Sequence, residues 1–257
     1  MVGVQTRIVA ITAGGHHPAI VLNALMDQFG PFPVLLEQPE DRSAFLRRRA
    51  ARIGWVQVAG QFPMMMWSRF GKRLAARRIE QIRTEHGLSF GLSPKLKRVP
   101  VPSVNSDVAR AHLRALAPEV VFVVGARMIG KATLSCIGTP FINYHAGINP
   151  AYRGQNGGYF ALASGDAGNF GATVHLIDEG VDTGAVLYQQ RVTPQKGDSI
   201  LTYPYLLAAK SRGICVKAVS DALESNLRPV KVGGPSRQWY HPTVWGYVWT
   251  GLVRGVW

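Results

Sequence analysis

Residues 120–145 read VVFVVGARMIGKATLSCIGTPFINYH, and this stretch decides the fold class. It holds two apolar runs, Val120–Val124 and Pro140–His145, on either side of a helical pattern over Ile129–Ile137. Such apolar runs are typical of strands buried on both faces of a parallel sheet. A strand, a helix and a strand in this order imply a right-handed crossover. The sequence therefore predicts an α/β fold with a doubly wound, mostly parallel sheet.

The residues before this stretch fit the same fold. Arg7–Ala13 is nearly all apolar and predicts the first strand, which two glycines end. Pro18 suits the first turn of a helix that continues through Ala19–Phe29, and Pro33–Leu36 predicts a short second strand. The remaining expected elements are a loop punctuated by Pro100 and Pro102, a helix capped by Asn105 or Ser106 and ending near Leu116, strands over Ala172–Ile177 and Ala185–Val192, and a long closing helix over Leu201–Ser225.

The length of the chain suits one domain with a small addition. At 257 residues, we expect a catalytic domain over residues 1–225 and a C-terminal appendage over residues 226–257. The appendage has an unusual share of aromatic residues, which are Trp239, Tyr240, Trp245, Tyr247, Trp249 and Trp257.

The composition is that of a globular protein, with 47% apolar and 17% charged residues. The net charge of +14 is compatible with nucleic acid, an anionic membrane surface or an anionic small molecule as a partner, and does not choose among them. Much of it comes from a basic, helical region over Asp41–Gly87 with arginines between 47 and 83. Its apolar positions recur at helical spacing, which favours solvated faces for the cations.

We expect a cytoplasmic protein without a metal. Cys136 and Cys215 are far apart in apolar surroundings, and neither belongs to a metal-ligand spacing. The first residues lack the long apolar core of a signal peptide. The apolar stretch Trp55–Trp67 is too short and too interrupted to span a bilayer.

Three polar residues follow the strand pattern in a way that indicates a site. Asn143 and His145 are two positions apart on one strand, so their side chains point the same way. They lie at the carboxyl edge of the sheet, where open α/β folds bind ligands. Asp182 lies in a turn between Gly180 and Gly184 that can bring a carboxylate to the imidazole. His175, on the next strand, is expected to be structural.

The segment from Phe141 to Gln190 resembles the folate-dependent formyltransferases. The features shared with that family are the Asn-x-His strand end, a Pro-x-Tyr-Arg-Gly loop, and GATVHLIDEGVDTG over residues 171–184. The resemblance implies that an amine attacks the formyl carbon of 10-formyltetrahydrofolate. Asn143 and a protonated His145 would then donate hydrogen bonds to the developing oxyanion, and Asp182 would favour the imidazolium and assist proton transfer.

The resemblance also assigns the binding residues. The folate candidates are Arg127, Met128, Ile129, Asp178 and Gly180. The candidates for the acceptor are Tyr152, Arg153, Gln155 and Asn156. No metal is implied.

The acceptor is the open question. The chain departs from the usual Ser-Leu-Leu-Pro loop of the family by having Gly147–Ile148–Asn149–Pro150. Its length and aromatic tail look similar to the sugar N-formyltransferases, which implies a nucleotide-linked amino sugar, with GDP-perosamine of O-antigen and lipopolysaccharide synthesis as the sharpest expectation. The alternatives are a methionyl-tRNA formyltransferase-like enzyme, or a nucleic-acid or membrane-surface binder on the same scaffold. A homodimer through the tail is a further hypothesis.

Overall fold

The protein is described by a computed structural model that covers residues 7–40, 43, 47, 50–51 and 54–257. A seven-stranded sheet forms its centre, with the strand order β3-β2-β1-β4-β5-β7-β8. The first five strands in this order are parallel, and β7 and β8 are antiparallel to their neighbours. The bounds are β1 Ile8–Thr12, β2 Pro33–Glu37, β3 Lys97–Val101, β4 Val120–Val124, β5 Phe141–His145, β7 Gly171–Leu176 and β8 Val186–Arg191. The predicted fold class, an α/β doubly wound and mostly parallel sheet, is confirmed.

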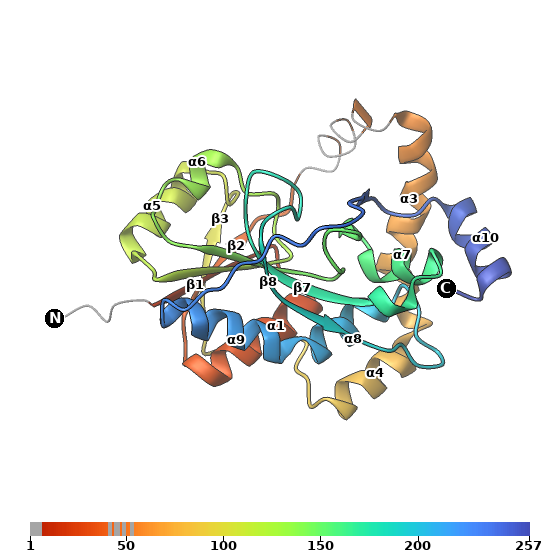
Figure 1. The fold of residues 1–257 in the computed structure, drawn as a ribbon, viewed down its shortest axis with the longest axis horizontal. Coiled ribbons are helices and arrows are strands. Elements are labelled where there is room, and N and C mark those ends of the chain that lie inside the picture. Colours follow the sequence, from red (N-terminus) through yellow and green to blue (C-terminus); the bar gives the residue numbers. More distant parts are fainter. Residues whose placement is uncertain (1–6, 41–42, 44–46, 48–49, 52–53) are drawn as a thin grey trace.

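Helices cover both faces of the sheet (Figure 1). On one face, α1, α8 and α9 pack together over the larger hydrophobic core. On the other face, α5 and α6 cover a smaller hydrophobic core. This core contains the side chains of β1 and β4 that point to that face. The bounds are α1 His16–Phe29, α5 Asp107–Leu116, α6 Lys131–Leu134, α8 Tyr203–Lys210 and α9 Arg212–Leu223.

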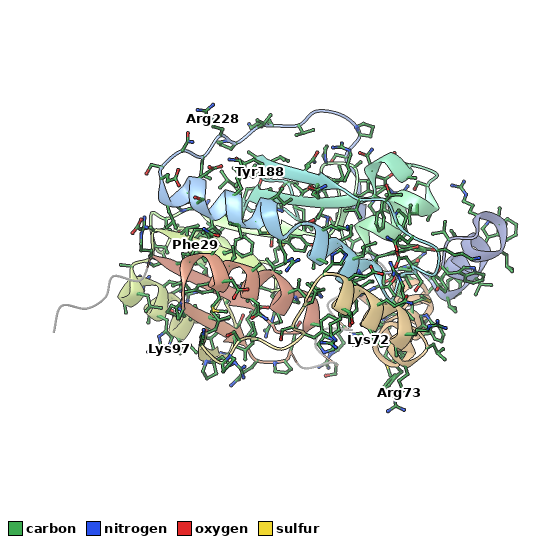
Figure 2. All side chains as sticks on the ribbon, turned by 90° about the horizontal axis from the view of Figure 1, so that it is seen from below. Phe29, Lys72, Arg73, Lys97, Tyr188 and Arg228 are labelled. Carbon is green, nitrogen blue, oxygen red and sulfur yellow. The ribbon has the colours of Figure 1, made fainter. Side chains whose placement is uncertain are left out.

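A second group of helices lies at one end of the sheet (Figure 1). Figure 2 shows the same arrangement from below, with α10 at the right-hand end of the molecule. The bounds are α3 Trp55–Phe70, the 3₁₀ turn η1 Gly71–Arg73, α4 Ala76–Glu85, α7 Gly157–Ala163, the 3₁₀ turn η2 Ala167–Asn169 and α10 Val244–Arg254. The predicted basic helical region 41–87 lies partly outside the described residues. None of the described helices is long and apolar enough to cross a membrane.

Local signals explain several element boundaries. The predicted cap of α5 is Ser106, whose hydroxyl accepts a hydrogen bond from the N–H of Ala109 at 3.2 Å. The helix predicted over Ile129–Ile137 is wrong at both ends, because α6 runs only from Lys131 to Leu134. The side chain of Asn105 donates a hydrogen bond to the carbonyl of Met128 and accepts one from the N–H of Gly130. These two backbone groups are therefore not available for an earlier turn of the helix.

Two further expectations are corrected. The loop expected around Pro100 and Pro102 contains strand β3, which includes Pro100. This is possible because β3 is the edge strand, so the missing N–H of Pro100 costs no hydrogen bond within the sheet. In place of the single closing helix expected over Leu201–Ser225, the structure has two helices that meet at Ser211. There the side chain of Arg212 donates a hydrogen bond to the carbonyl of Ala209.

The C-terminal segment runs back over the body of the protein. Val230 forms an isolated antiparallel bridge with Val186 of β8. Strand β9 (Gln238–Trp239) pairs in parallel with β6 (Arg153–Gly154) in a separate two-stranded sheet. The N–H of Ile200 donates to the carbonyl of Trp257 at 2.7 Å. The aromatic tail is therefore attached to the domain at three separate places.

Candidate active site

The site begins at the carboxyl end of β5, where Asn143 and His145 are located. Strand β5 lies between parallel β4 and antiparallel β7, and this pairing places His175 of β7 directly across from Asn143. His145 and His175 are both buried, at 7% and 2% exposure. The two histidines and the asparagine therefore come from neighbouring strands and meet at the sheet edge.

The loop after β7 brings Asp182 to these residues. Asp182 adopts a left-handed backbone conformation with φ of 50°. At Gly184 a side chain is impossible without movement, because a Cβ atom would lie 1.7 Å from the carbonyl of Leu176. Asn149 donates to the carbonyl of Asp182 at 3.0 Å, and Arg153 donates to the carbonyl of Val181 at 2.7 Å. The segment that follows β5 therefore holds the loop after β7 in place.

The side chains form a four-membered cluster around the carboxylate. Asp182 Oδ2 lies 3.4 Å from His145 Nδ1, and Oδ1 lies 3.3 Å from both His175 Nε2 and Asn143 Nδ2. Asn143 Nδ2 lies 3.1 Å from His175 Nε2. The N–H of Gly154 donates to Asp182 Oδ2 at 2.8 Å. The predicted residues Asn143, His145 and Asp182 are thus brought together, with a second histidine.

The electrostatics of this cluster keep the carboxylate ionised. Burial of Asp182 acts to raise its pKa, but His145, His175 and the N–H of Gly154 together hold the pKa well below its usual range. Its side chain is only 13% exposed. Asp182 is therefore a carboxylate throughout the neutral range, with one negative charge between two imidazoles.

Backbone carbonyls determine where the histidines carry their protons. His145 Nε2 lies 2.7 Å from the carbonyl of Tyr152, and His175 Nδ1 lies 2.7 Å from that of Leu176. A carbonyl can only accept a hydrogen bond, so each of these nitrogens carries its proton. An additional proton on either ring must then occupy the nitrogen that faces Asp182. The cluster is thus arranged to hold and release a proton next to the carboxylate.

The loop after β5 depends on a glycine. At Gly147 a Cβ atom would lie 2.5 Å from His145 Nε2 and 2.4 Å from the carbonyl of Tyr152. These two atoms form the hydrogen bond that orients the imidazole. Gly147 is one of the residues by which this loop departs from the family's usual sequence. Because Gly147 has no side chain, the backbone can pack closely on His145. The Asn149–Pro150 peptide bond in the same loop is cis.

A cavity of about 930 Å³ opens beside the cluster. This volume lies within the range of protein sites for small ligands. Asn143, His145, His175 and Asp182 all line it. The predicted folate residues also line it, and these are Arg127, Met128, Ile129, Asp178 and Gly180.

The walls of the cavity come from two parts of the chain. One wall is formed by residues around the ends of β4 and β7, including the predicted folate residues. The other wall is formed by α7, α8 and the C-terminal tail, with Tyr159, Tyr203, Gln238, Trp239, Tyr240 and His241. Among the predicted acceptor residues, Gln155 and Asn156 line the cavity. Tyr152 and Arg153 do not, since Tyr152 donates to Asp166 and Arg153 bonds Val181 and Ser236.

His175 is the site residue that sequence reasoning placed elsewhere, because its apolar neighbours on the strand suggest a structural histidine. Its position opposite Asn143 follows only from the antiparallel pairing of β5 and β7. The signal that could have found it is the alternation of β7, since His175 and Thr173 share one side of that strand. Thr173 pairs with His145 in the same register.

Two other kinds of site receive no support from the geometry. Gly87–Gly91 has the Gly-x-Ser-x-Gly spacing of a hydrolase nucleophile, but it follows α4 and leads toward β3 instead of joining a strand to a helix. The Ser89 hydroxyl donates to the carbonyl of Gly91. In the described part of the chain, no group of three His, Cys, Asp or Glu residues is arranged to hold a metal ion.

Comparison with known proteins relates part of this chain to one family. Residues 93–219 match the family model described as formyl transferase. The matched segment contains β5, β7 and all four residues of the cluster. The cluster therefore lies in the part of the chain that is similar to the formyl transferase family.

Individual relatives are similar over part of their length. Methionyl-tRNA formyltransferase from Halothermothrix orenii is 32% identical over 135 residues, which is 52% of this chain and 42% of that protein. The protein spans about half the length of the curated relatives that it matches.

Solved structures share the fold at low sequence identity. A sugar N-formyltransferase from Shewanella is 16% identical with a TM-score of 0.57, over 90% of this chain and 75% of that one. Glycinamide ribonucleotide transformylase 1 from Symbiobacterium toebii is 18% identical with a TM-score of 0.56, over 89% and 95%. The sugar 3-N-formyltransferase WlaRD, solved in the presence of dTDP and 5-N-formyltetrahydrofolate, is 12% identical with a TM-score of 0.55, over 92% and 70%.

Proposed function

We propose that this protein transfers a formyl group from 10-formyltetrahydrofolate to the amine of a nucleotide-linked amino sugar. The observation that carries the proposal is the cluster of Asn143, His145, His175 and Asp182 on the wall of a large cavity. The match to the formyl transferase family supports the formyl chemistry. The folate is supported by the formyltetrahydrofolate named with WlaRD.

The folate wall offers both polar and apolar groups. The Arg127 N–H and side chain are fixed by the buried Glu37, which also accepts from the N–H of Val104. Met128 next to it is 57% exposed and borders the cavity, which suits contact with a flat ring system. Asp178 binds the N–H of Gly180 and the hydroxyl of Thr183, so this carboxylate is held at the mouth of the cavity. These residues would hold the pterin.

The formyl donor supplies an electrophilic carbon, and the residues of the cluster act on the groups around it. Asn143 offers its amide N–H to the formyl oxygen as negative charge develops there. Asp182 and the imidazole nitrogens that face it would accept the proton that the attacking amine loses and return it to the folate nitrogen, whose bond to the formyl carbon breaks as the new amide forms. The distance of 3.4 Å between His145 Nδ1 and Asp182 Oδ2 is longer than an ordinary hydrogen bond. Of the four ring nitrogens of His145 and His175, this one is therefore held least tightly.

The opposite wall suits a nucleotide sugar. Trp239 lines this wall, and its ring is held in place by Phe160, with ring centroids 4.2 Å apart, and by the Arg237 guanidinium, 3.8 Å from the Trp239 ring centroid. Tyr203 and Tyr240 also line the cavity, and aromatic rings of this kind stack on bases and sugars. Within this class, we propose GDP-perosamine as the acceptor and O-antigen synthesis as the context.

Methionyl-tRNA remains the second candidate acceptor, because the curated relatives that the chain matches are methionyl-tRNA formyltransferases. The net charge of +14 also suits a nucleic acid. This candidate and the nucleotide sugar make different demands on the C-terminal wall. A tRNA acceptor would need the cationic surface, whereas a nucleotide sugar would need Trp239 and its neighbours in the cavity.

The test is turnover of 10-formyltetrahydrofolate with a panel of acceptors: GDP-perosamine, dTDP-linked 3-amino and 4-amino sugars, glycinamide ribonucleotide and methionyl-tRNA. We expect transfer to one nucleotide sugar, at a rate that Trp239→Ala lowers through a higher KM for that acceptor. Transfer to methionyl-tRNA alone would contradict the proposed acceptor and leave the formyl chemistry standing. Absence of transfer to every acceptor, with folate binding intact, would contradict the proposed enzyme activity.

A further inference from the structure

Two helices at one end of the molecule expose large apolar side chains. On α10, Trp245, Val248, Trp249 and Leu252 recur with the spacing of one helix face and are 43% to 73% exposed. The buried residues of that helix, Tyr247 and Gly251, lie on the other face. The apolar stripe of α10 thus points outward, which is the reverse of a helix that packs on its own core.

Helix α3 continues this apolar surface. Trp55, Val56, Phe62 and Phe70 are between 46% and 75% exposed. The two helices are in direct contact, because the Trp245 ring packs on Gly60, where a Cβ atom would lie 2.0 Å from it. We call this combined surface the α3–α10 face, defined by the exposed residues of Trp55–Phe70 and Val244–Arg254. Five of the six Trp residues of the chain lie in these two helices or at Trp257, just after α10.

The two helices lie within the basic segments of the sequence. Residues 42–79 and 225–257 contain 14 of the 29 Lys and Arg residues and none of the 15 Asp and Glu residues. They therefore account for the whole net charge of +14, and the rest of the chain is neutral. Lys72 and Arg73 follow α3 directly in η1, and both are exposed.

We propose that the α3–α10 face docks on the surface of an anionic phospholipid bilayer. Helices with an apolar stripe of Trp and Leu beside Lys and Arg lie in the headgroup region, with the apolar side inserted among the acyl chains. Trp side chains favour this boundary, and anionic lipids attract the cations. A second copy of the chain would instead bring the same positive charge against itself. Phosphates of a nucleic acid would match the cations and leave Val248 and Leu252 without a partner.

The experiment is flotation of the full chain with vesicles of phosphatidylcholine alone or mixed with phosphatidylglycerol. We expect binding to the mixed vesicles that weakens as salt is raised, and little binding to phosphatidylcholine alone. The variant Trp249→Ser with Leu252→Ser should bind about tenfold more weakly. The matched control is Val108→Ser, which alters a 47% exposed residue on α5 and should bind like the unchanged protein.

Thermal unfolding of each variant shows whether the fold is intact, because all three positions are exposed. The proposal would be overturned if the variant Trp249→Ser with Leu252→Ser bound vesicles as strongly as the unchanged protein. It would also be overturned if binding were the same with and without phosphatidylglycerol. A stable dimer that this variant dissociates and that vesicles do not bind would overturn it as well, since a second copy would then cover the face. The outcome is separate from formyl transfer, because none of these residues lines the cavity.

Discussion

At the scale of single residues, Asp182 is the point on which the other site residues converge. It contacts His145, His175 and Asn143 through its carboxylate, and Asn149 through its carbonyl. The identity of three of these residues follows from the sequence by resemblance to the family. The role of His175 does not, because a histidine within an apolar strand looks the same whether it faces a core or a site. Only the register of β5 with β7 distinguishes the two.

Asn143→Ala should lower kcat by about 100- to 1000-fold, because it removes a donor for the formyl oxygen. Binding of the folate should change little, since the predicted folate residues lie on other loops. Stopped-flow turnover and folate titration measure the two effects. Asn23→Ala is the control, because Asn23 bonds Gly91 and Ser93, far from the cavity lining. Near-normal turnover of Asn143→Ala would show that the oxyanion role is wrong.

His175→Leu should lower kcat and change its pH dependence. His175 helps to hold the pKa of Asp182 low, so its loss raises that pKa and moves the acid limb of the kcat/KM profile to higher pH. A purely structural histidine would lower activity without moving the limb. The pH profile of the variant, beside that of the unchanged protein, separates these cases.

Asp182 also links stability to pH. Its pKa is lower in the folded state than in the unfolded chain, so its ionised form stabilises the fold above pH about 4. This contribution is lost as the pH falls below that value. We therefore expect Asp182→Asn to be less stable than the unchanged protein at pH 7, with a difference that shrinks as the pH falls from 4 to 3. Urea unfolding at several pH values measures it, and a difference that grows toward pH 3 would contradict the assignment.

At the scale of elements, the pattern of the sheet is what the sequence predicts best. Strands β1, β2, β4, β5, β7 and β8 and the capped helix α5 are near their expected positions, because buried parallel strands are continuous apolar runs. The errors arise from contacts between residues that are distant in sequence. Asn105 delays the start of α6, and the edge position of β3 accommodates Pro100. Neither effect is visible in local periodicity, since each depends on residues distant in sequence.

The loop after β5 offers a test at this scale. Gly147→Ala should lower kcat by about tenfold or more, because the new Cβ would displace the Tyr152 carbonyl from His145 Nε2 and misplace the imidazole. Gly138→Ala is the matched control, since nothing lies within 4 Å of a Cβ there. Steady-state kinetics of both variants checks the prediction. Equal activity would mean that the loop adjusts without moving His145.

At the scale of the whole molecule, a buried ion pair joins α4 to the segment before α8. Arg78 Nε lies 2.8 Å from Asp198 Oδ1, with 11% and 0% of the two side chains exposed. Arg78→Met should lower the free energy of unfolding by about 3 kcal/mol, because it leaves a buried carboxylate without its partner. Arg83→Met breaks the exposed pair with Glu80 and should cost much less, because solvent screens that pair. Chemical denaturation of both variants tests this, and equal losses would contradict it.

The two walls of the cavity have different origins in the chain, and this separation affects how the protein can evolve. The cluster and the predicted folate wall lie within residues 123–182, whereas Gln238, Trp239, Tyr240 and His241 belong to the tail. Mutations confined to the tail can therefore alter the shape of one wall while the cluster keeps its geometry. A change of acceptor can therefore proceed through the tail, without a change in the residues that we propose for the transfer itself.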